Sequence, residues 1–282
     1  MSVVKHICRA LERVAPLRLA EKWDNVGLLL EAPQQRPDAH GVLLTIDLTT
    51  AVVDEALSSG TAFIVSYHPP IFKPLTSITL SDPLQHSLLR CAAAGISIYT
   101  PHTALDSVTG GINDWLCQVV TNWTTPKEVE YIGDADPEGA GGVGRLIKFD
   151  SIPMKELELR IKQNLKLEQI QAAYTSAWDI TNVESVAICA GSGSSVLLGV
   201  DADVYFTGEM PHHEVLAAVA SGRNVILCGH TNTERGYLPM LAEKIAAELQ
   251  LEIREASPAL QTPLSKLQVR VSETDHHPLW FV

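Results

Sequence analysis

Residues 41–70 read GVLLTIDLTTAVVDEALSSGTAFIVSYHPP, and this stretch decides the fold class. Two short apolar runs, GVLLTI at 41–46 and TAFIVS at 61–66, predict strands, and the segment between them has the apolar spacing of a helix. A strand, a helix and a second unbroken apolar strand are typical of a parallel sheet that is covered on both faces. The stretch therefore predicts an α/β fold.

The same alternation of strands and helices continues on both sides of this stretch. Further strands are expected at 96–99, 186–189, 203–207, 224–228 and 267–271, and helices at 4–14, 83–94, 110–121, 157–167 and 237–250. Residues 124–142 are rich in glycine and proline, which indicates a boundary. We predict two α/β lobes with mostly parallel central sheets. Residues 1–124 and 223–282 form the first lobe, which carries the metal ligands proposed below, and 125–222 form an inserted second lobe.

Composition excludes several classes of protein. The 282 residues include 33 Asp and Glu against 21 Lys and Arg, a net charge of −12, which argues against nucleic acid or an anionic membrane as the main partner. The 5 cysteines include no CxxC pair, so a reducing compartment is expected. No apolar run approaches the ~20 residues of a membrane span. We predict a cytoplasmic protein, with a nuclear or mitochondrial pool left open.

Polar residues directly follow three of the predicted strands. They belong to SYHPP at 66–70, PHTALD at 101–106 and GHTNTE at 229–234. In open α/β sheets the carboxyl ends of the strands form the ligand crevice, so these segments can meet at one rim. The side chains that this brings together are His68, His102, Asp106, His230 and Glu234. His230 and Glu234 are four residues apart, which places both on one face of a helical turn.

Imidazole and carboxylate groups in this pattern suggest a transition-metal site. They suit Zn, Mn, Fe, Co or Ni, whereas the absence of cysteine from the pattern argues against a structural zinc site. A single histidine after a strand is more often a satisfied core or capping residue. Three such segments at strand ends favour the metal interpretation.

Several motifs together resemble a known family. They are AEKWDNVGL at 20–28, SYHPPIF at 66–72, PHTALD at 101–106, GGIND at 110–114, TGEMPHH at 207–213 and GHTNTERGYL at 229–238. In this order they are similar to the NIF-three-like family, also labelled GTP cyclohydrolase I type 2 homologues. SYHPP and PHTALD resemble its eukaryotic branch in particular. The resemblance extends over essentially the whole chain.

The resemblance implies two α/β lobes with a dinuclear metal centre in the cleft between them. His68 and Asp106 would hold one divalent ion, His230 the other, and Glu234 would bridge the two. Many bacterial members have a histidine where this chain has Tyr67, and neutral tyrosine is a poor ligand. His102 matches a position that lines the site. It would act as a general acid or base, or would hold Asp106 in place.

Two classes of function remain open at this point. The first is a metal-dependent hydrolase of an unknown small molecule, with purine-nucleotide ring opening suggested only by the family label. The second is a metal-binding regulatory or scaffold protein that interacts with a transcriptional coregulator, as the family name suggests. The resemblance also implies a ring-shaped homo-oligomer built from dimers. An edge strand at 267–271 and the apolar tail at 279–282 could supply contacts, or the tail could pack on its own chain.

Other polar residues have a local structural interpretation beside a functional one. Glu209, His212 and His213 either face the metals or form a helix N-terminus with exposed histidines, and the second is favoured. The stretch GSGSS at 191–195 either cradles an anion or makes a strand-to-helix turn, and the turn is favoured.

Four further positions are assigned local or surface roles. Asp24 and Asn25 are expected to form hydrogen bonds in a turn near the cleft, with a direct catalytic role as the less favoured alternative. Asp47 is expected to cap a helix, with an approach to the site as the alternative. Asp275, in the metal-like motif DHHP, is expected in a surface or subunit contact.

Overall fold

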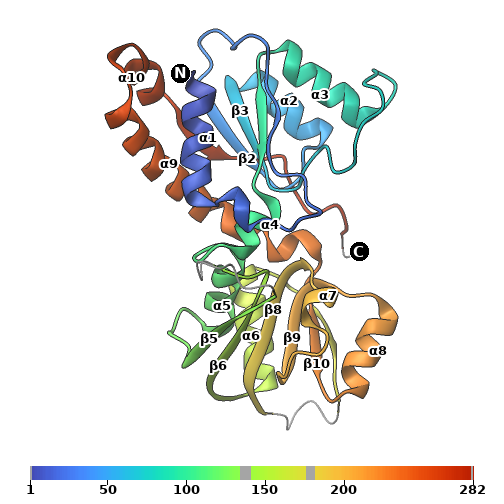
Figure 1. The fold of residues 1–282 in the computed structure, drawn as a ribbon. Helices are drawn as coiled ribbons and strands as arrows, with labels where there is room; N and C mark the ends of the chain where they lie inside the picture. The colour runs from blue at the N-terminus through green and yellow to red at the C-terminus, as the bar shows by residue number, and fades with distance from the viewer. Residues whose placement is uncertain (1, 134–140, 176–181, 281) are drawn as a thin grey trace. The chain divides into compact units, whose positions relative to one another are not determined.

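A computed structural model describes residues 2–133, 141–175, 182–280 and 282. The chain divides into two compact units. Unit 1 consists of residues 1–105 and 237–282, and unit 2 consists of residues 106–236. Each unit has its own sheet and helices (Figure 1).

Unit 1 is a five-stranded sheet with the strand order β1-β4-β3-β2-β11. Its strands are β1 (Gly27–Leu30), β2 (Gly41–Thr45), β3 (Thr61–Ser66), β4 (Ser97–Thr100) and β11 (Gln268–Val271). Its helices are α1 (Val3–Val14), η1 (Leu17–Leu19), α2 (Thr50–Ser58), α3 (Pro83–Ala93), α9 (Leu238–Glu255) and α10 (Pro258–Ser265). Within the described residues, only the β1–β4 pairing is antiparallel, so the sheet is mostly parallel, as predicted.

The centre of this sheet is buried on both faces, which explains its unbroken apolar strands. Every residue of β2 is buried. Leu43 and Ile64 pack with α2 and α3, while α9 packs against β2 and β11 and carries α1 and α10 (Figure 1). The Thr49 hydroxyl accepts the Val52 N–H and caps α2. The carboxyl ends of β3 and β4 are therefore rigidly placed.

Unit 2 is a six-stranded sheet with the strand order β5-β6-β8-β9-β10-β7. Its strands are β5 (Glu128–Ile132), β6 (Gly144–Pro153), β7 (Gln171–Ala173), β8 (Asn182–Ser192), β9 (Val204–Glu209) and β10 (Asn224–Leu227). Its helices are α5 (Ile112–Thr121), α6 (Met154–Leu165), α7 (Ser194–Leu197), α8 (His212–Ala220) and η3 (His230–Thr233). Helix α4 (His102–Ser107) and η4 (Arg235–Tyr237) span the limits between the units.

The unit 2 sheet is mixed rather than mostly parallel. Among the described residues, only β8–β9 and β9–β10 pair in parallel, whereas β5–β6, β6–β8 and β10–β7 are antiparallel. The α/β class with two units is confirmed, but the expectation of a mostly parallel sheet in the second is wrong. The antiparallel strands β5 and β7 have few buried residues, so their sequences lack the apolar runs that predict strands.

The limits of the units differ from the predicted lobe boundaries. Residues 106–124 and 223–236 were assigned to the first lobe, but α5, β10 and η3 belong to unit 2. Helix α5 packs on α6, β6 and β8, which makes it part of the unit 2 core. Consequently Asp106, His230 and Glu234 belong to unit 2, and His68 and His102 belong to unit 1.

One buried arginine organises the start of unit 2. Arg145 is fully buried, and its Nε lies 2.7 Å from an Asp114 carboxylate oxygen. Its guanidinium also donates to the carbonyls of Ser107 and Val108, at 3.2 and 3.1 Å. The ring of Tyr131 lies 4.5 Å from it. Arg145 thus fixes the backbone that directly follows Asp106.

Candidate metal centre

In unit 2, His230 and Glu234 lie in the turn that follows β10. His230 begins η3, and its Nε2 lies 3.3 Å from Oε1 of Glu234. Its Nδ1 lies 3.1 Å from Oε2 of Glu209, at the end of β9. Glu234 is 1% exposed, so its carboxylate lies within the protein rather than in solvent. An imidazole between two carboxylates is a donor set that suits a divalent cation.

Two glycines let neighbouring strands approach these side chains closely. A Cβ on Gly191 would lie 2.7 Å from Oε1 of Glu234 and 2.9 Å from Nε2 of His230. A Cβ on Gly208 would lie 2.8 Å from the His230 Cα. Such distances are shorter than real side chains tolerate. Both positions therefore require glycine for the His230–Glu234 arrangement to form.

Asp106 lies close enough to the buried Cys189 thiol for its negative charge to act on it, as does Glu234. Burial, together with the negative charges of Asp106 and Glu234, raises the pKa of Cys189 strongly. Both carboxylates therefore act on the same thiol from within unit 2. The Asp106 carbonyl also accepts the Asn113 Nδ2–H at 3.2 Å, and the Asn113 carbonyl oxygen accepts the Ala190 N–H at 2.9 Å.

In unit 1, His68 lies just beyond β3 and is oriented by Asp47. The His68 Nδ1 lies 2.9 Å from Oδ1 of Asp47, and the His68 N–H donates to the carbonyl of Ile46. A carboxylate on Nδ1 fixes the ring and leaves Nε2 for another partner, as at many metal-binding histidines. The expectation that Asp47 caps a helix is wrong, because Thr49 caps α2 instead.

His102 is held in a similar way by a buried aspartate. Its Nδ1 lies 2.8 Å from Oδ1 of Asp24, whose side chain is fully buried. Thr103 donates to Oδ2 of Asp24 through its N–H at 3.1 Å and through its hydroxyl at 2.5 Å. Burial would raise the pKa of Asp24, but the hydrogen bonds from His102 and Thr103 outweigh it and lower the pKa below its usual value. The expected local hydrogen bond also forms, because Oδ1 of Asp24 accepts the Asn25 N–H at 2.8 Å, but the contacts with His102 and Thr103 come from far along the chain.

Within unit 2, His230 and Glu234 lie within 3.3 Å of each other and could share a metal ion. His68, in unit 1, and Asp106, in unit 2, stay predicted ligands. His102 likewise stays a predicted catalytic residue. The sequence interpretation kept a place near the site for Asp47 and Glu209 only as the less favoured alternative, because their histidine partners are 21 residues away along the chain in each case.

Other predicted residues have local roles. His212 and His213 are exposed at the start of α8, as the favoured interpretation expected, whereas Glu209 bonds His230. The Gly191 N–H donates to Thr233 and the Gly193 N–H to Thr207, so residues 191–195 make a turn. Asp275 is buried and accepts the Ile46 N–H at 2.7 Å, so a surface position is wrong for this residue, whereas His276 and Pro278 of the same motif are exposed.

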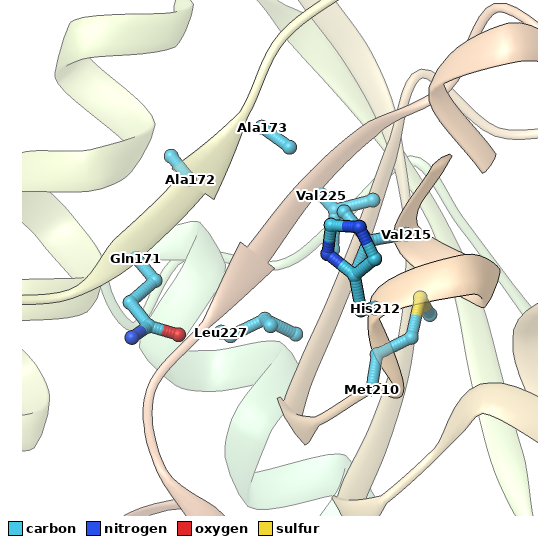
Figure 2. Close-up of a pocket in the computed structure, with 8 residues that line it drawn as sticks. All are labelled: Gln171, Ala172, Ala173, Met210, His212, Val215, Val225 and Leu227. Carbon is cyan, nitrogen blue, oxygen red and sulfur yellow. The ribbon is translucent and has the colours of Figure 1, made fainter. Parts of the chain in front are cut away.

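Unit 2 also contains a cavity of about 340 Å³, and neither His230 nor Glu234 lines it. Figure 2 shows it between α8 and the strands β7 and β10, with the His212 ring facing the strands. Its lining is mostly apolar: Gln171, Ala172, Ala173, Met210, His212, Val215, Val225 and Leu227.

Fold and side chains together define a two-unit α/β protein with a candidate metal-binding group. The pattern of the family described as Duf34/NIF3 (NGG1p interacting factor 3) matches residues 2–259, and the chain belongs to that family. The resemblance found in the sequence is thereby confirmed.

Relatives and a solved structure agree with this assignment. Protein NIF3 homolog of Schizosaccharomyces pombe is 45% identical, over 86% of this chain and 89% of that protein. NGG1-interacting factor 3 of Saccharomyces cerevisiae is 38% identical, over 82% and 86%. A Bacillus cereus protein related to NIF3 has the same fold, with a TM-score of 0.80 and 19% identity over 99% of this chain and 98% of that one. No helix in the described part of the chain is long and apolar enough to cross a membrane.

Proposed function

We propose that the chain is a divalent-metal-dependent hydrolase of a small molecule. The observation that carries this proposal is the His230–Glu234 pair, a buried carboxylate beside an imidazole that a second carboxylate orients. Carboxylate and imidazole ligands with few protein donors per ion leave positions for water and substrate, whereas closed structural sites use more cysteine or histidine. The donor set thus suits catalysis better than a structural role.

The residues proposed to hold the metal are His68, Asp106, His230 and Glu234. The family resemblance suggests two ions, with Glu234 shared between them. The donors fit Zn, Mn, Fe, Co or Ni, and availability in the cell would decide among these ions. Tyr67 in place of a histidine predicts that the ion at His68 and Asp106 is held more weakly than its neighbour.

Bound divalent ions would polarise the scissile bond and lower the pKa of water. The protein's own contribution is proton transfer at His102. Because Asp24 occupies Nδ1, Nε2 of His102 is left to accept or donate a proton. The buried Asp24 carboxylate would also stabilise the protonated ring, as an aspartate does for a catalytic histidine elsewhere.

The first experiment is elemental analysis of tag-free protein purified without added metal or chelator. Glu234→Ala is the test variant, and Glu243→Ala, at an exposed position on α9, is the matched control. About two ions per chain, lost in Glu234→Ala and kept in Glu243→Ala, would support the dinuclear centre. About one ion would mean that Tyr67 has weakened the second position. No metal after reconstitution would contradict the proposal.

Catalysis needs a second experiment. The loaded protein would be screened against phosphoesters, amides and purine nucleotides, with Glu234→Ala and His102→Asn beside it. Turnover that is lost in Glu234→Ala while the fold is kept would support the hydrolase. Undiminished turnover in Glu234→Ala would contradict it.

The alternative proposal is a metal-binding regulatory or scaffold protein. The name of the S. cerevisiae relative, NGG1-interacting factor 3, favours interaction with a transcriptional coregulator. A coregulator that binds the wild type and Asp106→Ala equally well would support this alternative, if no turnover is found. Loss of binding in a folded Asp106→Ala variant would count against it.

Assembly and compartment are also proposals. The tail residues Leu279 and Trp280 are 71% and 73% exposed, and β11 is an edge strand, so this region is available for contacts between copies in a dimer-based ring. Light scattering of Trp280→Ala against wild type would test the assembly. Imaging of the tagged chain would test the predicted cytoplasmic location against a nuclear or mitochondrial pool.

A further inference from the structure

Unit 1 carries a cluster of rings around His102, which we call the aromatic platform: Trp23, Tyr67, Phe72 and His102. The ring centroids of Trp23 and Phe72 are 5.9 Å apart. Those of Trp23, Tyr67 and Phe72 lie 6.0, 5.4 and 6.5 Å from that of His102. The His68 ring lies 5.5 Å from His102, so the platform adjoins the proposed metal ligand of unit 1.

The two outer rings of the platform are open to solvent. Trp23 is 61% exposed and Phe72 is 53% exposed, whereas Tyr67 is buried. Large exposed aromatic side chains in contact with each other, beside polar groups, are typical of binding sites rather than of ordinary surface.

The backbone on both sides of the platform is fixed. Asp24, next to Trp23, is held by His102 and Thr103. Asn25 donates from Nδ2 to the carbonyl of Ile71, next to Phe72, at 2.5 Å. The segments that carry the two exposed rings are therefore tied to each other and to His102, so little ordering would be needed when a ligand binds.

We propose that the platform binds a planar heteroaromatic ring of the substrate, which stacks on Trp23 and contacts Phe72, whose ring is tilted by 58° to that of Trp23. This inference rests on the proposed function, because it names the substrate class of that same site. A heterocycle stacked there would lie beside His102 and His68. Nitrogen-containing rings stack well on indole and phenyl faces, and such stacking is tolerant of the particular base.

A cationic ligand would suit exposed aromatic faces as well. The competition experiment described below distinguishes it from a heterocycle.

The experiment is calorimetric titration of the full chain with adenosine, and with ribose as the probe that lacks the ring. The test variants are Trp23→Ala and Phe72→Ala. Trp123→Ala is the matched control, because Trp123 is 57% exposed but lies in unit 2. We expect adenosine affinity to fall about tenfold or more in Trp23→Ala, less in Phe72→Ala and not at all in Trp123→Ala.

Several outcomes would overturn the inference. These are adenosine affinity that is unchanged in Trp23→Ala, ribose binding as tight as adenosine binding, or no adenosine binding by the wild type. Competition by tetramethylammonium that Trp23→Ala abolishes would show a cation site instead. Circular dichroism of each variant checks the fold, and loss of affinity in Phe72→Ala keeps the test decisive if Trp23→Ala misfolds.

Metal analysis of the same samples separates this inference from the proposed function. If the protein binds no metal but binds adenosine in a way that depends on Trp23, the platform proposal is supported and the hydrolase proposal is contradicted. If Trp23→Ala keeps its metal and its adenosine affinity is unchanged, the platform proposal is contradicted and the hydrolase proposal is not. Glu234→Ala should lose metal and keep adenosine binding.

Discussion

The two units hold their functional histidines in different ways. In unit 1, His68 and His102 each have one carboxylate on Nδ1, and aromatic rings surround them. In unit 2, His230 lies between two carboxylates and against glycine backbone. Unit 2 therefore concentrates carboxylates around its histidine, as a bound cation would require, whereas unit 1 orients its two histidine rings among aromatic side chains.

The largest effect is expected at Arg145, on which the unit 2 arrangement depends. Arg145→Met would leave the Asp114 carboxylate and buried carbonyls without their donor, so we expect the free energy of unfolding to fall by about 3–5 kcal/mol. Arg160→Met is the control, since its pairing with Glu156 on the surface of α6 is worth at most about 0.5 kcal/mol. Urea denaturation measures both. Equal effects would contradict a special role for Arg145.

Local pattern was enough to find the residues at the strand ends. β3, β4 and β10 are short apolar runs, and a histidine follows each of them within a few residues, so His68, His102 and His230 could be found from the sequence. The resemblance then gave their grouping. An apolar run therefore predicts where a strand ends, and the candidate site residues come directly after that end.

Long-range partners could not be found in this way. Arg145 lies outside the strands and helices expected from the sequence, and nothing near it in the sequence shows that it binds the carbonyls of Ser107 and Val108. Gly191 reads as a turn residue, although it also makes room for Glu234. The exposed strand β5 has no buried face, and its pairing with β6 is decided by tertiary contact rather than by its own pattern.

The second prediction distinguishes the close approach of Gly191 to His230 and Glu234 from backbone strain alone. Gly191 and Gly199 both have positive φ, at +64° and +91°, but only Gly191 faces the ligands. Alanine is strained at positive φ, so Gly191→Ala and Gly199→Ala should both lower the free energy of unfolding. Gly191→Ala should in addition displace His230 and Glu234 and weaken metal binding about 100-fold, or about 2.7 kcal/mol. Competition with a chelator measures the affinity. Equal metal affinity in the two variants would show that the close approach is unimportant.

The third prediction concerns the buried aspartate of unit 1. Asp24→Asn removes the charge that accepts from His102 and Thr103, so we expect a loss of about 2 kcal/mol in stability near neutral pH. The pKa of Asp24 is lowered in the folded protein, so its contribution is fully present above the unfolded value near 3.8 and is lost as the pH falls through the lower folded value. Wild type and variant should therefore converge in stability below that pH. A difference that persists undiminished in acid would assign the loss to packing instead.

The smallest effect is expected from Asp47→Asn. Its comparison with Asp24→Asn distinguishes the two histidine–carboxylate pairs of unit 1. Asp47 is partly exposed, so Asp47→Asn should change stability little. It should weaken metal binding about tenfold, or 1.4 kcal/mol, because His68 loses the partner that orients its ring. Asp54→Asn, at an exposed surface pair with Arg90, is the control. If Asp24→Asn weakened metal binding more than Asp47→Asn, His102 rather than His68 would be the histidine of unit 1 that serves the metal.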